Sequence, residues 1–409
     1  MMIVLKTNYN FWKKIFYIII ISLSISPAFA TSDVDNRNYL LIACMSIGPI
    51  LFLSIGTIKW KTDGLVLLLI SLIFITQILF NPQSVRWTSI FFSCMFFIYF
   101  LTAIKVVKKA RINYSTLCNI TKYIIYAYAI VLIIQQICVL TGLPIFNHIG
   151  VAESKWKLNA LSAEPSHTSR YVGILMYSFL HFKDKIVGYR IPFKECFRKN
   201  QKIWMAFLWV ILTTVSGTAM IVLALILSRY LTKKNLILAC TFLGIAFMVG
   251  VKSDMTALRR STSFLTAVMT GDTKLMMATD HSASVRVVPA ILCIERIEPL
   301  SLRGWVGEGG GSTATWMSNY MPGVPKGWSG GAMASYALEY GLLVSLLFIG
   351  LSFNWCYDKN NKLCTIGLWL ICVVLIGVNS QIAWLCILML YLDKNLSVRN
   401  ENKSILQFT

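Results

Sequence analysis

Long apolar runs separated by short polar segments dominate the pattern of hydrophobic and polar positions along this chain. The longer runs approach the roughly 20 residues that a helix needs to cross about 30 Å of hydrocarbon. They lack a polar face at helical spacing, which distinguishes them from the helices of a soluble core. Because backbone groups in lipid must bond within their own segment, such runs form helices. The pattern therefore predicts an all-α integral membrane protein with about twelve transmembrane helices.

The first expected span, Ile15–Ala30, follows Lys13 and Lys14 and ends in a sequence that resembles a signal-peptidase site. We expect it to remain as an uncleaved helix, and its cleavage would leave the rest of the topology unchanged. The further expected spans are Tyr39–Ile58, Leu65–Phe80, Trp87–Ile104, Ile120–Leu140, Tyr171–Phe182, Ile203–Val215, Thr218–Tyr230, Leu236–Val251, Ala332–Phe353, Cys364–Val378 and Ile382–Leu392.

Positive charge is unevenly distributed over this topology. If both termini are cytoplasmic, most of the 38 Lys and Arg residues lie on the inner side, and the richest cluster runs from Lys183 to Lys202. This bias orients membrane proteins, so the formal net charge of +21 requires no nucleic acid partner. If the spans on either side of Ser216-Gly217 formed one continuous helix, the alternation of sides would shift and a basic cluster would lie outside. We therefore expect two short helices that meet there at an external turn.

Two external segments are long, from Thr141 to Arg170 and from Lys252 to Gly331. Long loops of this kind are usually functional or disordered, and the second one is too apolar for disorder. We expect it to fold as a cap that is helical from Ser282 to Ile297. The chain then divides into residues 1–251 with about nine spans, the large periplasmic loop 252–331, and residues 332–409 with the last three spans and a cytoplasmic tail.

Composition limits the chemistry that this chain can carry. Charged residues make up only 13% of the sequence, against roughly 25% in soluble domains. Nearly all of the 11 cysteines lie in apolar runs or on the inner side, so neither a disulfide framework nor a metal site or other cofactor is expected. Glu339 is the main ionisable residue within a span. Proton-coupled transporters use relays of ionisable residues within the membrane. Because such residues are scarce in the expected spans, we expect any chemistry at the external face.

The run from Ala163 to Arg170 concentrates polar side chains just before a span. Pro165 is suited to the first turn of a helix, which would place Glu164, His167 and Arg170 three residues apart and the last two on one face. A carboxylate or imidazole can act as a general base, and Arg binds phosphate oxygens in bidentate fashion. The alternative is a helix cap with an interfacial Arg.

A second polar cluster lies in the large loop. Its glycines would allow a ligand to approach the backbone, and consecutive N–H groups can cradle an anion. The aromatic residues Trp305, Trp316 and Trp328 suit either sugar stacking or the membrane interface. A flexible surface loop with solvated charges is the alternative. The cluster contains His281, Ser282, Arg286, Arg296, Pro299, Arg303, Gly304, Trp305, Gly307, Glu308, Gly309, Gly310 and Gly311.

Together these segments resemble Wzy-type O-antigen polymerases, which belong to the superfamily of O-antigen polymerases and ligases. The resemblance covers the architecture of nearly the whole chain, and its motifs are short. This chain lacks the basic residue common at the family's turn between two short helices. It also has His281 where an acidic residue is frequent. The segments that carry the resemblance are Glu164–His167, Ser282 to Arg286 followed by Pro299, Gly304–Gly307, and Thr213–Gly217.

The resemblance implies a metal-independent glycosyltransferase of the bacterial inner membrane with a periplasmic active face. Such an enzyme transfers the growing glycan from undecaprenyl pyrophosphate to the next lipid-linked repeat unit. The implied partners are undecaprenyl-pyrophosphate-linked oligosaccharide, membrane lipid and a chain-length regulator protein. The departing pyrophosphate needs preorganised cations, and the acceptor hydroxyl needs a base. The expected catalytic residues are Glu164, His167, Arg170 and Arg286, and the expected substrate-binding residues are Arg303, Arg296, Trp305, His281, Gly307 and Gly309.

Other functions fit parts of the same sequence. An O-antigen ligase, which moves finished polymer to the lipid A core, shares the scaffold. A polysaccharide or lipid flippase would need a polar path between helices, for which Gln135, Gln136 and Glu339 are the only hints. A binding or signalling membrane protein is a third class, but the inner loops are too short for an output domain.

Overall fold

The computed structural model of the chain describes residues 9–29, 38–56, 58–83, 85–147, 156–214, 216–231, 263, 266–279, 281–324 and 327–396, without the side chains of residues 61, 62, 281 and 282. The regular elements in these residues are all helical, and none of the described residues forms a β-strand. The expected all-α class is confirmed. The expected span Leu236–Val251 and the first residues of the large loop lie outside the described residues.

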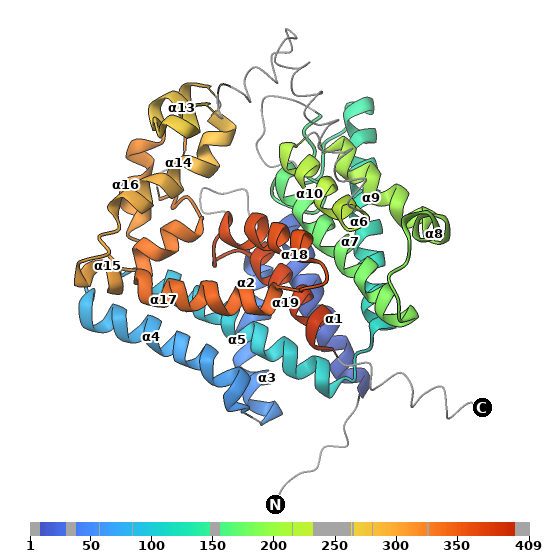
Figure 1. Cartoon of the computed structure of the whole chain (residues 1–409), viewed down its shortest axis with the longest axis horizontal. Coiled ribbons are helices and arrows are strands. Elements are labelled where there is room, and N and C mark those ends of the chain that lie inside the picture. Colours follow the sequence, from blue (N-terminus) through green and yellow to red (C-terminus); the bar gives the residue numbers. More distant parts are fainter. Residues whose placement is uncertain are drawn as a thin grey trace, which may run out of the picture.

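The helices follow one another along the chain as labelled in Figure 1. The N-terminal part contains α1 (Tyr9–Ile25) with the short turn Ser26–Phe29, α2 (Tyr39–Ser46), α3 (Gly48–Ile55), the π-helical turn Trp60–Gly64, α4 (Leu65–Phe80), α5 (Trp87–Lys109), α6 (Tyr114–Thr141), α7 (Pro165–Val187), α8 (Phe193–Lys199), α9 (Gln201–Thr213) and α10 (Gly217–Ser228). The C-terminal part contains α13 (Thr273–Thr279), α14 (His281–Arg296), α15 (Leu302–Val306), α16 (Thr313–Tyr320), α17 (Met333–Cys356), α18 (Lys362–Trp369) with the π-helical turn Leu370–Val374, and α19 (Gln381–Asn395).

Four of the described helices are long and apolar enough to cross a membrane, and this fits a membrane protein. They are Tyr9–Phe29, Trp87–Lys109, Tyr114–Thr141 and Met333–Cys356. Further apolar helices of 10–17 residues occupy other expected spans. At 1.5 Å per residue, these shorter helices fall below the roughly 30 Å of the hydrocarbon core. The number of about twelve full spans therefore stays a prediction.

Helix α19 lies at the centre of the bundle (Figure 1). It packs against α7, α17 and α1, and its residues from Ile382 to Leu390 are all buried. A helix that is apolar all round is suited to this position, because no face of it has to meet water. Helices α6, α7, α9 and α10 form one flank, and α4, α5 and α17 form the other.

The two ends of the described chain lie on one side of the bundle. The Arg111 guanidinium, between α5 and α6, lies 4.6 Å from the ring centroid of Tyr9 at the start of α1. The hydroxyl of Tyr114, at the start of α6, donates to the carbonyl of Leu396 just after α19. The basic α5–α6 connection is on this same side, which agrees with the bias of positive charge towards the side of the termini.

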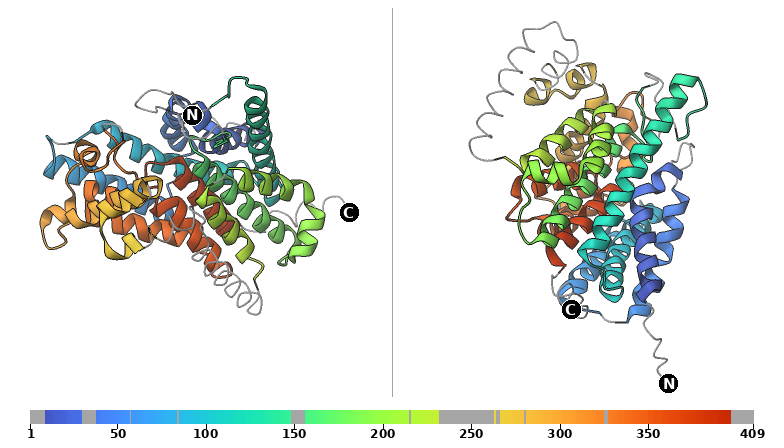
Figure 2. Two further views of the ribbon diagram at one scale, coloured as in Figure 1. Left: turned by 90° about the horizontal axis from the view of Figure 1, so that it is seen from above. Right: turned by 90° about the vertical axis from the view of Figure 1, so that its right-hand side faces the viewer.

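A second, smaller core lies in the segment between α10 and α17. Buried side chains from α13, α14, α16 and α17 form it, including Met276, Val288, Cys293, Met317 and Leu338. Figure 1 shows these helices together at the upper left, against α17, and the right-hand view in Figure 2 shows the same region at the far end from the start of α1. The segment thus packs as a cap around α14. This helix runs from His281 to Arg296, and the expected helix Ser282–Ile297 differs from it by one residue at each end.

Helix α17 is broken at Gly341, whose backbone is left-handed with φ 86° and ψ 162°. The break leaves the carbonyls of Leu338 and Glu339 without their helical partners. They accept instead from the N–H groups of Glu308 at 2.9 Å and Gly309 at 3.0 Å. The loop therefore fills the break in the helix, and this fixes the cap on the bundle.

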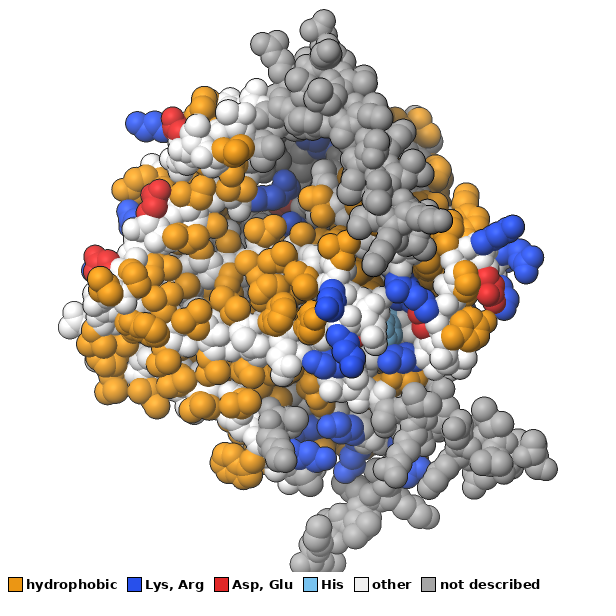
Figure 3. Space-filling model, in the orientation of Figure 1, with side chains coloured by type: hydrophobic (Ala, Val, Ile, Leu, Met, Phe, Trp, Pro, Cys, Tyr) orange, Lys and Arg blue, Asp and Glu red, His pale blue; other side chains and the backbone are white. Residues whose placement is uncertain are grey.

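The surface also separates by chemistry (Figure 3). Apolar side chains form a broad area over the flank that contains α4 and α17. Lys and Arg side chains gather towards the ends of α5, α7 and α19. An apolar belt with cations at its edge is the pattern expected where a bundle meets lipid and then water.

The close contact at Gly341 predicts that Gly341→Ala destabilises the protein. A Cβ there would lie 2.2 Å from the backbone oxygen of Trp305, and the φ of 86° disfavours any side chain. We expect the free energy of unfolding to fall by roughly 2–5 kcal/mol from strain and overpacking. Thermal unfolding of the detergent-purified protein measures the effect.

Gly350→Ala provides the matched control, because Gly350 lies in the same helix and a Cβ there would meet nothing within 4 Å. Alanine favours helix over glycine, so this variant should unfold at the same temperature or slightly higher. Equal unfolding temperatures for the two variants would contradict the role of the break.

Candidate functional site

The start of α7 is set by Pro165, as the sequence predicts. The preceding residue, Glu164, is extended at φ −143° and ψ 155°, which is the conformation that a following proline imposes. Its carboxylate does not cap the helix. It accepts instead from the hydroxyl of Ser166 at 3.2 Å. Glu164 therefore occupies the cap position of α7 without a side-chain cap bond, and its carboxylate lies near the guanidinium of Arg286.

A buried polar network holds the segment that leads into α7. The side chain of Gln135, in α6, accepts from the N–H of Ala160 at 2.8 Å and donates to the carbonyl of Phe146 at 2.7 Å. The hydroxyl of Thr168 donates to the carbonyl of Asn159 at 2.6 Å. The polar groups of this network are shielded from water, so their bonds restrict the backbone strongly. The network thereby fixes the position of Glu164 and the first turn of α7.

The two polar clusters of the sequence meet at this point. Arg286, from α14 of the cap, lies with Nη2 4.0 Å from Oε2 of Glu164, and both side chains are about half exposed. In Figure 3, basic side chains are visible in a hollow between α14 and α10. The structure therefore brings together the residues expected to be catalytic, Glu164, His167, Arg170 and Arg286.

Arg170 is the most unusual member of this group. It is only 3% exposed, and its Nε is enclosed without a hydrogen-bond partner. Its guanidinium forms no hydrogen bond or ion pair with any residue that the structure describes. A buried unpaired charge carries a large desolvation cost. Such a group is stabilised when an anion binds beside it.

The protonation states favour base chemistry at neutral pH. Glu164 and His167 precede the apolar part of α7, which begins at Tyr171. The neighbouring His167, together with Arg286 and Arg170, lowers the pKa of Glu164, so this side chain is a carboxylate. Burial, reinforced by the two guanidinium groups, lowers the pKa of His167 to about 4, so this ring is neutral. Both groups can therefore accept a proton.

The turn between α9 and α10 also reaches this site. Helix α9 ends at Thr213 and α10 begins at Gly217, so two separate short helices are present as predicted. The hydroxyl of Thr214 lies 3.4 Å from that of Ser169 in α7. Three segments that carry the family resemblance thus converge on the start of α7.

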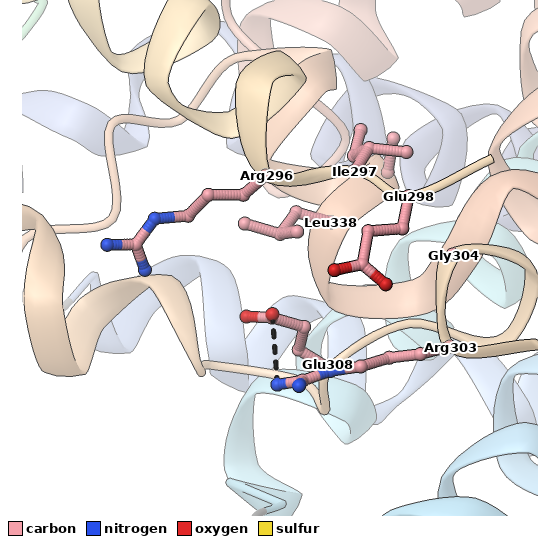
Figure 4. Close-up of a pocket in the computed structure, with 8 residues that line it drawn as sticks. Arg296, Ile297, Glu298, Arg303, Gly304, Glu308 and Leu338 are labelled. Carbon is pink, nitrogen blue, oxygen red and sulfur yellow. Dashed lines mark ion pairs between the residues drawn. The ribbon is translucent and has the colours of Figure 1, made fainter. Parts of the chain in front are cut away.

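The expected binding residues other than His281 lie in a second group, at the far end of α14. Figure 4 shows Arg303 paired with Glu308 and Arg296 directed away from them. The Arg303 to Glu308 distance is 3.0 Å. The Arg296 guanidinium lies 3.6 Å from the ring centroid of Trp316. Because Arg286 and Arg296 are about 15 Å apart along the helix, this group is separate from the Glu164 site.

The glycine stretch does not present an anion cradle. The N–H of Gly307 donates to Arg303, that of Gly309 donates to Glu339, and that of Gly310 donates to the side chain of Gln77 at 2.7 Å. These N–H groups are therefore used inside the protein. The glycines serve close packing, since a Cβ at Gly307 would lie 2.3 Å from the backbone oxygen of Glu339.

The other predicted binding residues have mixed outcomes. Trp305 is 43% exposed and donates from Nε1 to the carbonyl of Pro299 at 2.9 Å. Trp316 and Trp328 pack against the core of the cap. His281 begins α14, but its side chain lies outside the described residues. Within the described part of the chain, no three His, Cys, Asp or Glu side chains gather as metal ligands would.

Two polar residues that favoured a transporter have structural partners. Gln135 belongs to the buried network below α7. Glu339 accepts from the N–H of Thr313 at 3.3 Å and from its hydroxyl, and thereby holds α16 against α17. A lone polar residue in an apolar run indicates only that a partner exists. The identity of that partner, far away in the sequence, could not be read from the pattern.

Comparisons with known proteins found no match: no family model matches, no curated protein is similar, and no solved structure matches the fold. The fold and the site define an all-helical protein of membrane character, with a charged site where a separate cap meets the start of α7.

The unpaired state of Arg170 predicts an unusual effect on stability. Arg170→Met removes a buried charge and keeps the volume, so the free energy of unfolding should stay the same or rise by up to about 3 kcal/mol. Thermal unfolding of the purified protein without added substrate measures this.

Arg229 provides the matched comparison. It is also buried, but it is paired with Asp184. Arg229→Met leaves that carboxylate without its partner and should cost about 3–5 kcal/mol. A similar loss in both variants would show that Arg170 is a structural residue.

Proposed function

We propose that this chain polymerises lipid-linked oligosaccharide repeat units at the periplasmic face of the bacterial inner membrane. The growing glycan is transferred from undecaprenyl pyrophosphate to the next lipid-linked repeat unit. Buried Arg170, next to Glu164, His167 and Arg286, is the observation that supports this most. An unpaired guanidinium beside a carboxylate and a neutral imidazole suits a reaction that needs both an anion site and a base.

The reaction assigns a separate task to each charge. The acceptor hydroxyl attacks the anomeric carbon of the donor glycan and gives its proton to Glu164 or His167. The bond between that carbon and the pyrophosphate oxygen breaks, and lipid pyrophosphate leaves with the bonding electrons. Arg170 and Arg286 stabilise the negative charge that develops on the pyrophosphate. Because pyrophosphate is already a good leaving group, this scheme needs no metal.

The proposed orientation rests on the distribution of charge. The start of α7 lies at the opposite end of that helix from its basic end at Lys185, and the basic α5–α6 connection lies on the side of the chain termini. If positive charge marks the cytoplasm, the Glu164 site faces the periplasm, where lipid-linked repeat units are joined. A regulator of chain length is a further proposed partner.

Arg286→Ala should abolish long polysaccharide. Loss of one preorganised charge typically costs on the order of 10²–10³ in rate. The polysaccharide banding pattern of a deletion strain that carries the variant gives the readout, and immunoblotting of membranes confirms insertion. Lys274→Ala is the matched control, because Lys274 is an exposed cation of the same cap. Normal-length polymer from Arg286→Ala would refute the assignment.

The deletion strain itself separates polymerase from ligase. Loss of a polymerase leaves lipid A core that bears a single repeat unit, whereas loss of a ligase leaves core without any repeat. Elongation of lipid-linked repeats by the purified protein in detergent would exclude a flippase.

The pH dependence should be flat near neutrality. Since the pKa of Glu164 is lowered and that of His167 is about 4, both groups are in the base form above about pH 5.5. The elongation rate should be level from about pH 5.5 to 8 and fall only below that range, as these groups take up protons. An inflection near pH 6.5 that disappears in His167→Gln would contradict this prediction.

A further inference from the structure

A cavity of about 350 Å³ lies at the other end of α7, away from the Glu164 site. It is bounded by α7, the α17–α18 connection and the last turns of α19. Tyr177, His181 and Lys185 follow one another at intervals of four, so they form one stripe of α7 along the cavity. At 1.5 Å per residue, Lys185 is about 27 Å from His167, and this places the cavity on the side of the chain termini.

Lysine side chains line the outer part of this cavity. Lys185, Lys359 and Lys394 contribute from three different elements. The Lys394 ammonium donates to the carbonyl of Asn354 at 2.6 Å. Those of Lys185 and Lys359 form no hydrogen bond or ion pair with the residues that the structure describes. Two free ammonium groups beside an open cavity are suited to a phosphate.

The cavity also contains a buried carboxylate, Asp393 of α19, which is 4% exposed. Its Oδ2 accepts from Ser178 at 3.5 Å, and its Oδ1 is enclosed without a partner. The other carboxylate, Asp358, is already bonded to the N–H of Asn360 and the side chain of Asn361. Asp393 thus has an acceptor oxygen left for a bound group. Arg229 is the cation of the protein that acts on this carboxyl most strongly, and a bound ammonium would add to that stabilisation.

We propose that this cavity binds a headgroup that carries both a phosphate and a primary amine. The phosphate pairs with Lys185 and Lys359, and the ammonium donates to Asp393. A phosphate alone would place its charge near the unpaired carboxylate, and an amine alone would leave the lysines unmatched. Basic pockets between helices on the cytoplasmic side are known positions for lipid headgroups. The zwitterionic headgroup of phosphatidylethanolamine satisfies both ends of the cavity.

Binding to the delipidated full-length protein in detergent tests this proposal. Native mass spectrometry gives apparent affinities for phosphatidylethanolamine, phosphatidylglycerol and phosphatidylcholine of equal chain length. We expect phosphatidylethanolamine to bind about tenfold more tightly than the other two, because only it offers an N–H donor on a cation. Soluble phosphoethanolamine is then added as a competitor. Displacement identifies a ligand recognised by its headgroup alone, and failure to displace identifies a membrane lipid.

Three variants assign the contacts. The double variant Lys185→Ala/Lys359→Ala should weaken all phosphate-containing probes, whereas Lys202→Ala, an exposed cation on α9, should change none. Asp393→Asn should remove the preference for phosphatidylethanolamine over phosphatidylcholine. Equal affinity for the three lipids in the unaltered protein, or unchanged binding by the double variant, would overturn the proposal. Lys185 and Lys359 lie at the rim of the cavity, so the double variant should fold. It therefore tests the proposal even if Asp393→Asn does not fold.

Discussion

The break in α17 at Gly341 is the constraint on which the rest of the structure depends. A helix in an apolar bundle cannot leave carbonyl groups unpaired, because no water is there to bond them. The carbonyls of Leu338 and Glu339 are satisfied only if the chain after α15 enters the break. That entry holds the cap against the bundle, and α14 then packs on α17. Through this chain of contacts, Arg286 reaches Glu164.

Local signals in the sequence predicted local structure well. Proline at position 165 and the Ser216-Gly217 pair fix where helices begin and end, since they act on the backbone directly. The packing role of the glycine stretch Gly307–Gly311 could not be predicted from the sequence. Its partners, Gln77 and Glu339, are far away in the sequence, and a glycine that allows packing looks the same as one that faces a ligand. Apolar runs alone also do not determine how many helices cross the membrane fully, because the helix that forms within a run can be shorter than the hydrocarbon core.

Two buried guanidinium groups show how context decides the role of the same residue type. Arg229 meets Asp184, so its charge is neutralised inside the protein. Arg170 has no such partner among the described residues. The free-energy cost of keeping it buried has to be offset by favourable contacts elsewhere in the fold. Proteins retain unfavourable charges of this kind where binding needs them.

If α9 and α10 span the membrane as proposed, these short helices beside the Glu164 site also affect the surrounding bilayer. Helices α9 and α10 have 13 and 12 residues, which corresponds to about 20 Å and 18 Å along their axes. A bilayer thins where it meets apolar segments shorter than its hydrocarbon core. Lipids next to this flank would then hold their headgroups deeper than elsewhere in the membrane. Under the proposed function, a carrier lipid that diffuses into this thinned region would arrive with its diphosphate already near the level of Arg170, without being lifted out of the leaflet.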